Sequence, residues 1–185
     1  DPKNIEEARC LVWSSAISTS NSELVAGRTK GLQLIHRGEL LDAVMAPFPQ
    51  RIAVGGSHGK TTTCAMVTNV LAAAGLDPVA LVGGKFAGSP SGARLGTGAV
   101  FVAEADESDR SFLKLHPTVS LVTNVDREHV ETYADMAEVS EAFRSFATSV
   151  PVDGTAILCA DDLIARAIAE KGGERCLTYG FSESA

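Results

Sequence analysis

The sequence predicts an α/β protein in which helices flank a mostly parallel β-sheet. Short apolar runs alternate with helical patterns along the whole chain, as an α/β fold requires. The run Val100-Phe101-Val102-Ala103 shows no polar alternation, which is typical of a parallel strand buried on both faces. A glycine-rich segment, residues 55–59, separates an apolar run from a helical pattern. Open sheets of this class bind their ligands beyond the carboxyl ends of the strands, so the segment after this run is a candidate site.

Two strands and two helices are expected before a pair of prolines. The apolar runs predict strands at 11–13 and 32–35, and helical patterns follow Ser20 and cover 39–45. Ser20 and Glu23 have the spacing of a capping box, and Gly31 is placed to end the first helix. Pro47 and Pro49 stop the second helix, and we expect a domain boundary there that divides the chain into residues 1–47 and 48–185.

The rest of the chain continues the alternation. Strands are expected at 51–54, 79–82, 100–103, 118–123, 155–159 and 176–179, and a helix is expected from the glycine-rich segment to about residue 75. Asp135 and Glu138 form a second capping box before an apolar stripe with spacings of three and four residues. Asp161 is expected to cap a last helix, which Gly172 closes.

The composition excludes several classes of protein. Hydrophobic residues make up 45% of the 185 residues and charged residues 21%, so the chain can bury a core and is not disordered. Its net charge of −7 argues against binding to nucleic-acid phosphates. No apolar stretch is long enough to cross a membrane, and the N-terminus is no secretory signal. The four cysteines are scattered and form no CxxC pair, which predicts a cytoplasmic protein without a zinc site.

The segment from Gly56 to Thr61 predicts a phosphate-binding loop of the P-loop type. Its glycines let backbone N–H groups approach phosphates at the start of a helix. Lys60 would reach the terminal phosphates of a nucleotide, and the Thr61 hydroxyl would hold Mg²⁺. The common pattern has a glycine five residues before Gly59, where this chain has Val54, so the loop is a shorter variant. The candidate nucleotide-binding residues are Gly56, Ser57, His58, Gly59, Lys60, Thr61 and Thr62. The alternative is a plain glycine-rich turn, and His58 is either a brace for the loop or an ordinary polar residue.

A second candidate group follows the buried strand that ends at Glu104. Because this carboxylate stands at the carboxyl end of a strand, it could meet the metal held by Thr61. Asp106, Glu107 and Asp109 come next, and a solvated acidic loop that caps a helix is the competing interpretation. We prefer that interpretation for Asp109 and a functional role for Glu104.

A third group follows the strand expected at 118–123. Asn124 could bind substrate or fix the neighbouring loop. His129 could be a metal ligand, a base or a plain surface residue, and its spacing alone does not distinguish these roles.

Taken together, these motifs resemble the Mur ligase family. The loop Gly56–Thr63 is similar to the family's Gly-Thr-His-Gly-Lys-Thr-Thr signature, with Ser57 in place of the usual threonine. The segment from Thr123 to His129 resembles the family's Thr-Asn…His motif, with Glu128 where many members have aspartate. The stretches 14–17 and 36–41 look like the end of the family's first domain. In the acidic motif 104–109, Ser108 matches the members that use L-alanine, because the related murein-peptide ligases tend to carry tyrosine there.

The resemblance implies an ATP-dependent, ADP-forming ligase of peptidoglycan precursor synthesis. Such an enzyme joins L-alanine to the carboxylate of UDP-N-acetylmuramate through an acyl phosphate. The implied catalytic residues are Lys60, Glu104 and His129, and Mg²⁺ would be held by Thr61, Glu104 and His129. Asn124, Glu107 and Ser108 are implied substrate contacts.

The resemblance also divides the chain. Residues 1–47 would form the C-terminal part of a Rossmann-like domain that binds the UDP-sugar, and residues 48–185 an incomplete central ATP-binding domain. We therefore expect a fragment, without an initiator Met, that binds ATP–Mg weakly and does not ligate on its own. An open sheet edge near Val12 would invite pairing with a second copy.

Three other functions compete with this interpretation. One is a murein-peptide or folylpolyglutamate-type ligase, against which Ser108 and the N-terminal segment argue. Another is a P-loop kinase or NTPase switch, which the short loop and the Asn124…His129 pair disfavour. The last is a non-catalytic nucleotide-binding fragment.

Overall fold

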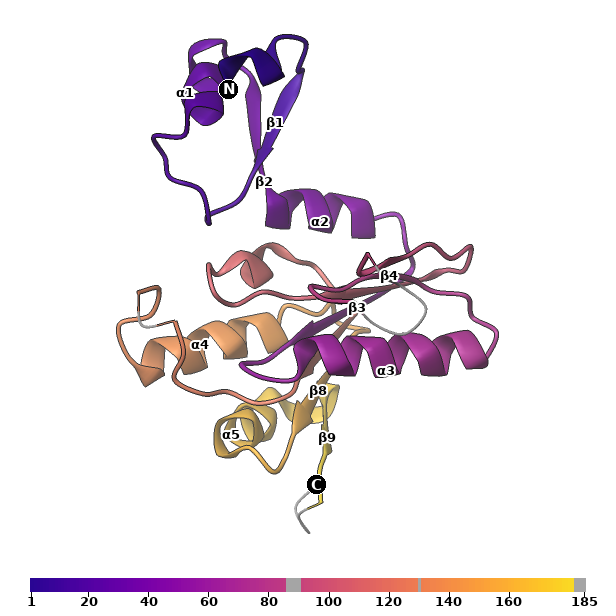
Figure 1. The fold of residues 1–185 in the computed structure, drawn as a ribbon. Coiled ribbons are helices and arrows are strands. Elements are labelled where there is room, and N and C mark those ends of the chain that lie inside the picture. Colours follow the sequence, from indigo (N-terminus) through magenta and orange to yellow (C-terminus); the bar gives the residue numbers. More distant parts are fainter. Residues whose placement is uncertain (86–90, 130, 182–185) are drawn as a thin grey trace.

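The computed structural model describes residues 1–85, 91–129 and 131–181, and it confirms an α/β architecture with mostly parallel strands. A small two-stranded sheet, β1-β2, lies at one end of the molecule, and a seven-stranded sheet forms the main body (Figure 1). Within the described residues no helix is both long and apolar enough to span a membrane.

The small N-terminal unit holds two parallel strands and a helix. It consists of the 3₁₀ helix Pro2–Ile5 (η1), β1 (Cys10–Trp13), α1 (Ser22–Thr29) and β2 (Gln33–His36). The prediction that Ser20 caps the first helix is wrong, because Asn21 accepts the backbone N–H groups of Glu23 and Leu24 instead. Gly31 follows the helix with φ of 70°, a conformation that glycine adopts without strain.

Helix α2 (Arg37–Met45) connects the two sheets. It begins with a capping box between His36 and Glu39, a pair that sequence reasoning missed because histidine is an uncommon cap. Met45 is fully buried in the same core as Phe112 and Phe143, so α2 packs against the main body. The predicted division at 47/48 falls in the short turn after this helix and stays a prediction.

The large sheet has the strand order β5-β4-β6-β3-β7-β8-β9. Its strands are β3 (Gln50–Gly55), β4 (Val79–Leu81), β5 (Ala93–Arg94), β6 (Val100–Glu104), β7 (Val119–Val122), β8 (Thr155–Cys159) and β9 (Cys176–Tyr179). All described pairings are parallel except the short edge pair β4-β5, and β5 was not predicted.

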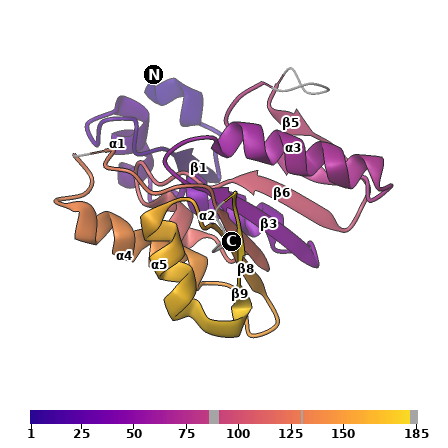
Figure 2. The same ribbon diagram turned by 90° about the horizontal axis from the view of Figure 1, so that it is seen from below.

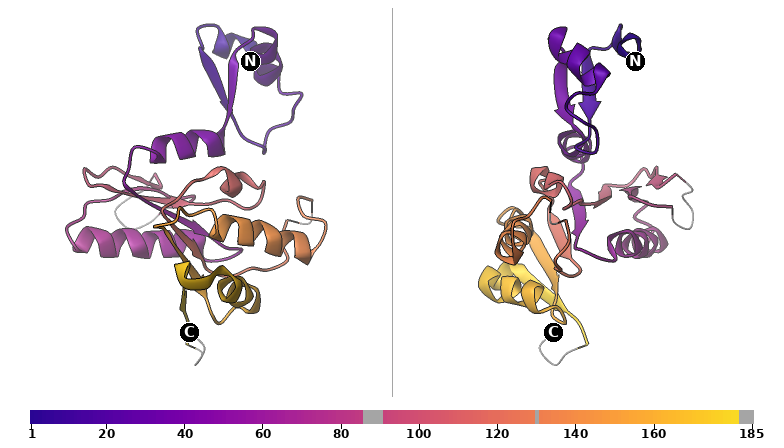
Figure 3. Two further views of the ribbon diagram at one scale, coloured as in Figure 1. Left: turned by 180° about the vertical axis from the view of Figure 1, so that it is seen from behind. Right: turned by 60° about the vertical axis from the view of Figure 1, so that its left-hand side comes forward.

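Helices cover both faces of this sheet. Helix α3 (Lys60–Ala73) lies on one face, and α4 (Met136–Ala147) and α5 (Leu163–Gly172) lie on the other (Figures 2 and 3). Two 3₁₀ helices, Ser111–Lys114 (η2) and Gly173–Arg175 (η3), complete the described elements. The prediction that Asp161 caps the last helix is wrong by one residue, because Asp162 accepts the N–H groups of Ile164 and Ala165. The predicted cap at Asp135 is confirmed by its bond from the Glu138 amide.

Strand β6 shows why its sequence has no polar alternation. Val100 and Val102 join the core under α3, while Phe101 and Ala103 join the core under α4 and α5. Burial on both faces leaves only the strand end for a polar side chain, and Glu104 stands there. Since β3 lies between β6 and β7 and all three strands are parallel, the segments that follow them meet at the carboxyl end of the sheet.

Candidate functional site

The loop after β3 is shaped by two glycines and leads directly into α3. Gly56 has φ of 138°, and a Cβ atom there would lie 1.9 Å from Thr123 Oγ1. Gly59 is the N-cap residue of α3 in the left-handed conformation, and no side chain caps that helix end. The uncapped first-turn amides and the helix dipole make this position suitable for an anion.

The segment after β7 braces the loop from behind. Asn124 Oδ1 accepts the His58 amide at 2.8 Å, and its Nδ2 donates to the His58 carbonyl at 3.0 Å. Thr123 Oγ1 donates to the same carbonyl at 2.7 Å, and Ser57 Oγ accepts the Asp126 amide at 2.8 Å. Of the two roles considered for Asn124, the structure favours fixing the loop.

Two other predicted loop residues have exposed side chains. The His58 side chain is largely exposed, 3.6 Å from both Asp126 and Glu128, and its backbone amide is already used by Asn124. Thr62 is exposed in the first turn of α3. Their nucleotide contacts stay predictions.

Lys60 folds over the loop as the first residue of α3. Its ammonium donates to the carbonyl oxygens of Gly56 at 2.6 Å and Ser57 at 3.1 Å, and to Glu107 Oε1 at 2.9 Å. The lysine therefore lies at the loop, where a phosphate group would need it.

Glu104 lies beside Thr61, as its position at the strand end predicts. Thr61 Oγ1 donates to Glu104 Oε2 at 2.9 Å, and the Gly83 amide donates to the same oxygen at 2.8 Å. The strand end, the first turn of α3 and the segment after β4 thus converge on one carboxylate.

Glu107 is almost completely buried, with 3% of its surface exposed. Burial raises the pKa of its carboxyl above the ordinary value, and the hydrogen bond from Lys60 opposes that shift. Its Oε2 is the one buried side-chain polar atom in residues 1–85, 91–129 and 131–181 that has no hydrogen-bond partner.

His129 faces acidic side chains on three sides. Its Nε2 lies 3.5 Å from Glu107 Oε1 and 4.0 Å from Glu128 Oε2, and its Nδ1 lies 3.7 Å from Glu131 Oε1. Ligand atoms of Glu107, Glu128 and His129 all lie within 4.8 Å of one another, close enough to share a metal ion. Glu104 is not part of this group, so the structure places His129 nearer to Glu107 than the predicted ligand set implies.

Arg37 ties α2 to the acidic segment after β6. Its guanidinium contacts Asp106 Oδ2, and Asp109 Oδ2 lies 3.2 Å away. Asp109 is not a solvated loop residue, as we preferred to interpret it, because its side chain is 13% exposed. Burial raises the pKa of this carboxyl, but hydrogen bonds from Ser111 and Ser15 and the charge of Arg37 outweigh burial and lower the pKa to about 2.

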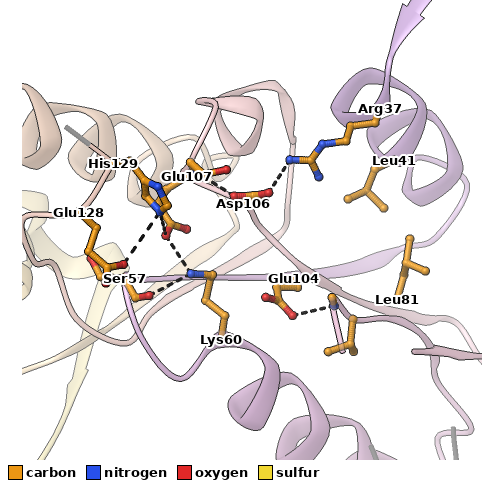
Figure 4. Close-up of a pocket in the computed structure, with 13 residues that line it drawn as sticks. Arg37, Leu41, Ser57, Lys60, Leu81, Glu104, Asp106, Glu107, Glu128 and His129 are labelled. Atoms are coloured by element: carbon orange, nitrogen blue, oxygen red, sulfur yellow. Dashed lines mark hydrogen bonds and ion pairs between the residues drawn. The ribbon is translucent and has the colours of Figure 1, made fainter. Parts of the chain in front are cut away.

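Many of these groups, though not all, line one pocket of about 480 Å³ (Figure 4). The predicted residues that line it are Ser57, Lys60, Glu104, Glu107, Ser108 and His129. Asn124 and Thr62 are not among its lining residues, which agrees with the bracing contacts of Asn124. Arg37 lines the pocket too, and its place in the stretch 36–41 that resembles the family was a signal that could have identified it.

The site combines features that suit the binding of a polyphosphate and a divalent cation. It has an uncapped helix N-terminus, a lysine at the loop, and several carboxylates able to hold a divalent cation. Donors and cations fixed in this way can stabilise charge that develops on a bound phosphate.

Comparison with known proteins agrees with these features. Residues 54–185 match the family model for the Mur ligase middle domain. The chain is 42% identical over 184 residues to the UDP-N-acetylmuramate–L-alanine ligase of Aquifex aeolicus and 46% identical over 185 residues to that of Salinispora arenicola. These matches cover 100% and 98% of the chain but 40% and 36% of the relatives, so the chain spans about two fifths of their length.

Solved structures show the same fold. The UDP-N-acetylmuramate–alanine ligase of Thermotoga maritima superposes with a TM-score of 0.82 at 24% identity and covers 99% of this chain and 41% of that one. A UDP-N-acetylmuramate:L-alanyl-gamma-D-glutamyl-meso-diaminopimelate ligase from Neisseria meningitides has a TM-score of 0.79 at 25% identity, covering 97% and 61%. With the middle-domain model matched over most of its length, the chain belongs to the Mur ligase family.

Proposed function

We propose that this chain is the ATP-binding part of an ADP-forming ligase that joins L-alanine to the carboxylate of UDP-N-acetylmuramate in peptidoglycan precursor synthesis. The observation that carries the proposal is the meeting of Lys60, Glu104 and His129 around one pocket beside an uncapped helix N-terminus. The names of the relatives support the choice of reaction.

The triphosphate of ATP would lie on the loop 56–61. The close approach of Gly56 to Thr123 leaves no room for a side chain, and Gly59 opens the first turn of α3. Lys60 would give up one of its present bonds for a bond with a phosphate oxygen and stabilise the charge that develops during phosphoryl transfer.

The donor set at the pocket also fits Mg²⁺. Hydroxyl and carboxylate oxygens are the ligands this ion prefers, and a buried carboxylate oxygen of Glu107 has no partner among the described residues. We propose that Thr61, Glu104 and His129 hold the ion, as the family resemblance implies. A bound Mg²⁺ would reduce the repulsion between the attacking carboxylate and the triphosphate.

The reaction needs positioning more than proton transfer by the protein. The sugar carboxylate takes the γ-phosphoryl group and ADP leaves; the amine of L-alanine then forms the amide bond and phosphate leaves. Ser108 lines the pocket next to the acidic cluster, and we assign it with Glu107 to the substrate side. Its identity favours L-alanine transfer over the murein-peptide and folylpolyglutamate alternatives.

Three further assignments remain predictions. They are the UDP-sugar domain at residues 1–47, a cytoplasmic location, and self-association through the edge of β1, where Val12 is exposed. The chain alone is expected to bind nucleotide without ligating, so alanine-dependent phosphate release from the 185 residues would contradict that expectation.

Nucleotide titration of the chain tests the loop. Replacing Lys60 by alanine removes a charged donor to the phosphates, and we expect ATP–Mg to bind roughly 10–100-fold more weakly, measured by isothermal titration calorimetry. Lys114→Ala is the matched control, because that lysine is exposed and pairs with Glu39 away from the loop. Equal binding by the wild type and the Lys60→Ala variant would refute a phosphate-binding role.

A further inference from the structure

The ammonium of Lys60 has no donor left for a phosphate group. An ammonium carries three N–H donors. In the structure Gly56, Ser57 and Glu107 supply three acceptors. A phosphate oxygen can therefore bind Lys60 only after one of these contacts is given up, and the contact to Glu107 is the one that carries an opposite charge.

Glu107 makes this contact from a fixed position. The hydroxyl of Tyr133 donates to the Glu107 carbonyl at 2.7 Å, and Tyr133 is itself buried. The guanidinium of Arg110 lies over the Tyr133 ring at 4.8 Å. The backbone of Glu107 is thus held from behind, while its carboxylate points toward Lys60 and His129 in the pocket (Figure 4).

Lys60 donates the short side-chain hydrogen bond to Oε1 of the Glu107 carboxylate, and His129 Nε2 lies 3.5 Å from the same oxygen. Oε1 accepts from Lys60, and Oε2 has no partner in the part of the chain that the structure describes. A buried carboxylate that loses its cationic partner is costly, and phosphate groups beside it would add repulsion. Glu107 and a phosphate group therefore compete for the same ammonium.

We propose that Glu107 is a positioning residue that occupies the place of a phosphate oxygen on Lys60, and that nucleotide binding has to displace it. The inference rests on the proposed phosphate-binding role of the loop. It gives Glu107 an action through Lys60 that is separate from any contact with substrate. Before nucleotide binds, Glu107 keeps the lysine folded over the loop, and after the reaction the returning carboxylate favours release of ADP and phosphate.

The test measures the binding of pyrophosphate and of ATP in metal-free buffer by isothermal titration calorimetry. Glu107→Gln keeps the size of the side chain but has no charge, so it should bind both ligands about tenfold more tightly than the wild type. Glu128→Gln is the matched control, because Glu128 lines the same pocket and contacts His58 and His129 rather than Lys60. Removing one negative charge near the pocket without freeing Lys60 should tighten binding less, by under about threefold. Glu107→Asp keeps the charge, so its affinity should stay near that of the wild type.

A second measurement reads the ion pair directly. The ammonium signal of Lys60 in ¹⁵N NMR, assigned by its loss in Lys60→Ala, should be protected in the free wild type. That protection should be lost in Glu107→Gln. In the wild type the chemical shift of the signal should change when pyrophosphate binds. A merely structural role for Glu107 would lower the melting temperature of Glu107→Gln without tightening the binding of either ligand.

The outcomes separate the two claims. If the wild type binds pyrophosphate no better than Lys60→Ala, the phosphate-loop function fails and this inference fails with it. If Lys60→Ala loses binding but Glu107→Gln gains none, or Glu128→Gln gains as much, only the competition between Glu107 and phosphate is overturned.

Discussion

Single backbone positions decide whether the loop after β3 can take its shape. At Gly56 the chain turns with φ of 138° directly against Thr123, and the space that a Cβ atom would need is filled. At Gly31 the chain also takes a positive φ, yet nothing lies within 4 Å of the added atom. A side chain at Gly31 would meet only conformational strain, whereas a side chain at Gly56 would meet both strain and a steric conflict.

Gly56→Ala should therefore destabilise the chain much more than Gly31→Ala. A residue other than glycine in the left-handed region costs about 1–2 kcal/mol, which is the expected effect at Gly31. At Gly56 the conflict with Thr123 adds to the strain, and we expect a total of roughly 3 kcal/mol or more. Urea unfolding of both variants measures the difference, and similar losses of stability would contradict the role given to Thr123.

Short segments at the edge of the large sheet depend on one carboxylate. Asp77, between α3 and β4, accepts bonds from the Thr97 amide, the Arg94 guanidinium and the Thr97 hydroxyl, each at 2.8 Å. These bonds fix the stretch after β5, where the backbone passes so close to Leu76 and Asp77 that Gly98 has no room for a side chain. The bonds, led by the one from the Thr97 amide, lower the pKa of Asp77 to about 2.

This shift predicts a stability change in acid. Because the folded pKa lies below the unfolded value of about 3.9, the ionised carboxylate stabilises the fold above that pH. The contribution should disappear as the pH falls from about 4 to 2. Urea unfolding at pH 7, 4, 3 and 2.5 should show the wild type losing its advantage over Asp77→Asn across this range. Asp153→Asn, at an exposed position, is the control, and an advantage that stays constant with pH would refute the assignment.

The elements that could be predicted from the sequence are those whose local pattern has a single explanation. The unbroken apolar run of β6 and the Gly-Lys-Thr turn into α3 specify both their structure and their place at the sheet edge. Caps were predicted less well, because Asn21 and Asp162 stand next to equally good candidates, and the spacing alone does not show which of the two accepts the helix amides. The two-residue strand β5 has too little sequence to form a pattern.

The contacts within the site were the least predictable part. The spacing of Lys60, Glu107 and His129 does not show that the first two form a partly buried ion pair, because that depends on the order of β3, β6 and β7 in the sheet. Motif spacing shows which residues lie at strand ends, but it does not show which of them face each other.

Helix α2 and its first residue, Arg37, link the two sheets of the molecule. Arg37, at the start of this helix, bonds to Asp106, Asp109 and Ser111 in the segment that follows β6. The same segment carries Glu107, so the small unit at the N-terminal end is linked to the wall of the pocket.

Arg37→Met should loosen this link while keeping the apolar stem of the side chain. We expect amide hydrogen exchange in α2 and in residues 104–111 to become roughly tenfold faster, because charge-assisted bonds are lost. Hydrogen-exchange mass spectrometry measures this. Lys114→Met, which removes the exposed pair with Glu39, should change the exchange far less, and equal effects of the two variants would argue against a special role for Arg37.

Because β3 lies in the middle of the sheet, the parts of the phosphate-binding site form in a fixed order during translation. The ribosome makes the loop after β3 early, but its braces arrive late, since Asn124 follows His58 by 66 residues. A nascent chain that has emerged only as far as α3 carries the whole Gly-Lys-Thr motif and lacks the side chains that shape it. Competence to bind phosphate should therefore appear abruptly, when β7 adds to the sheet, and not when the motif itself leaves the ribosome.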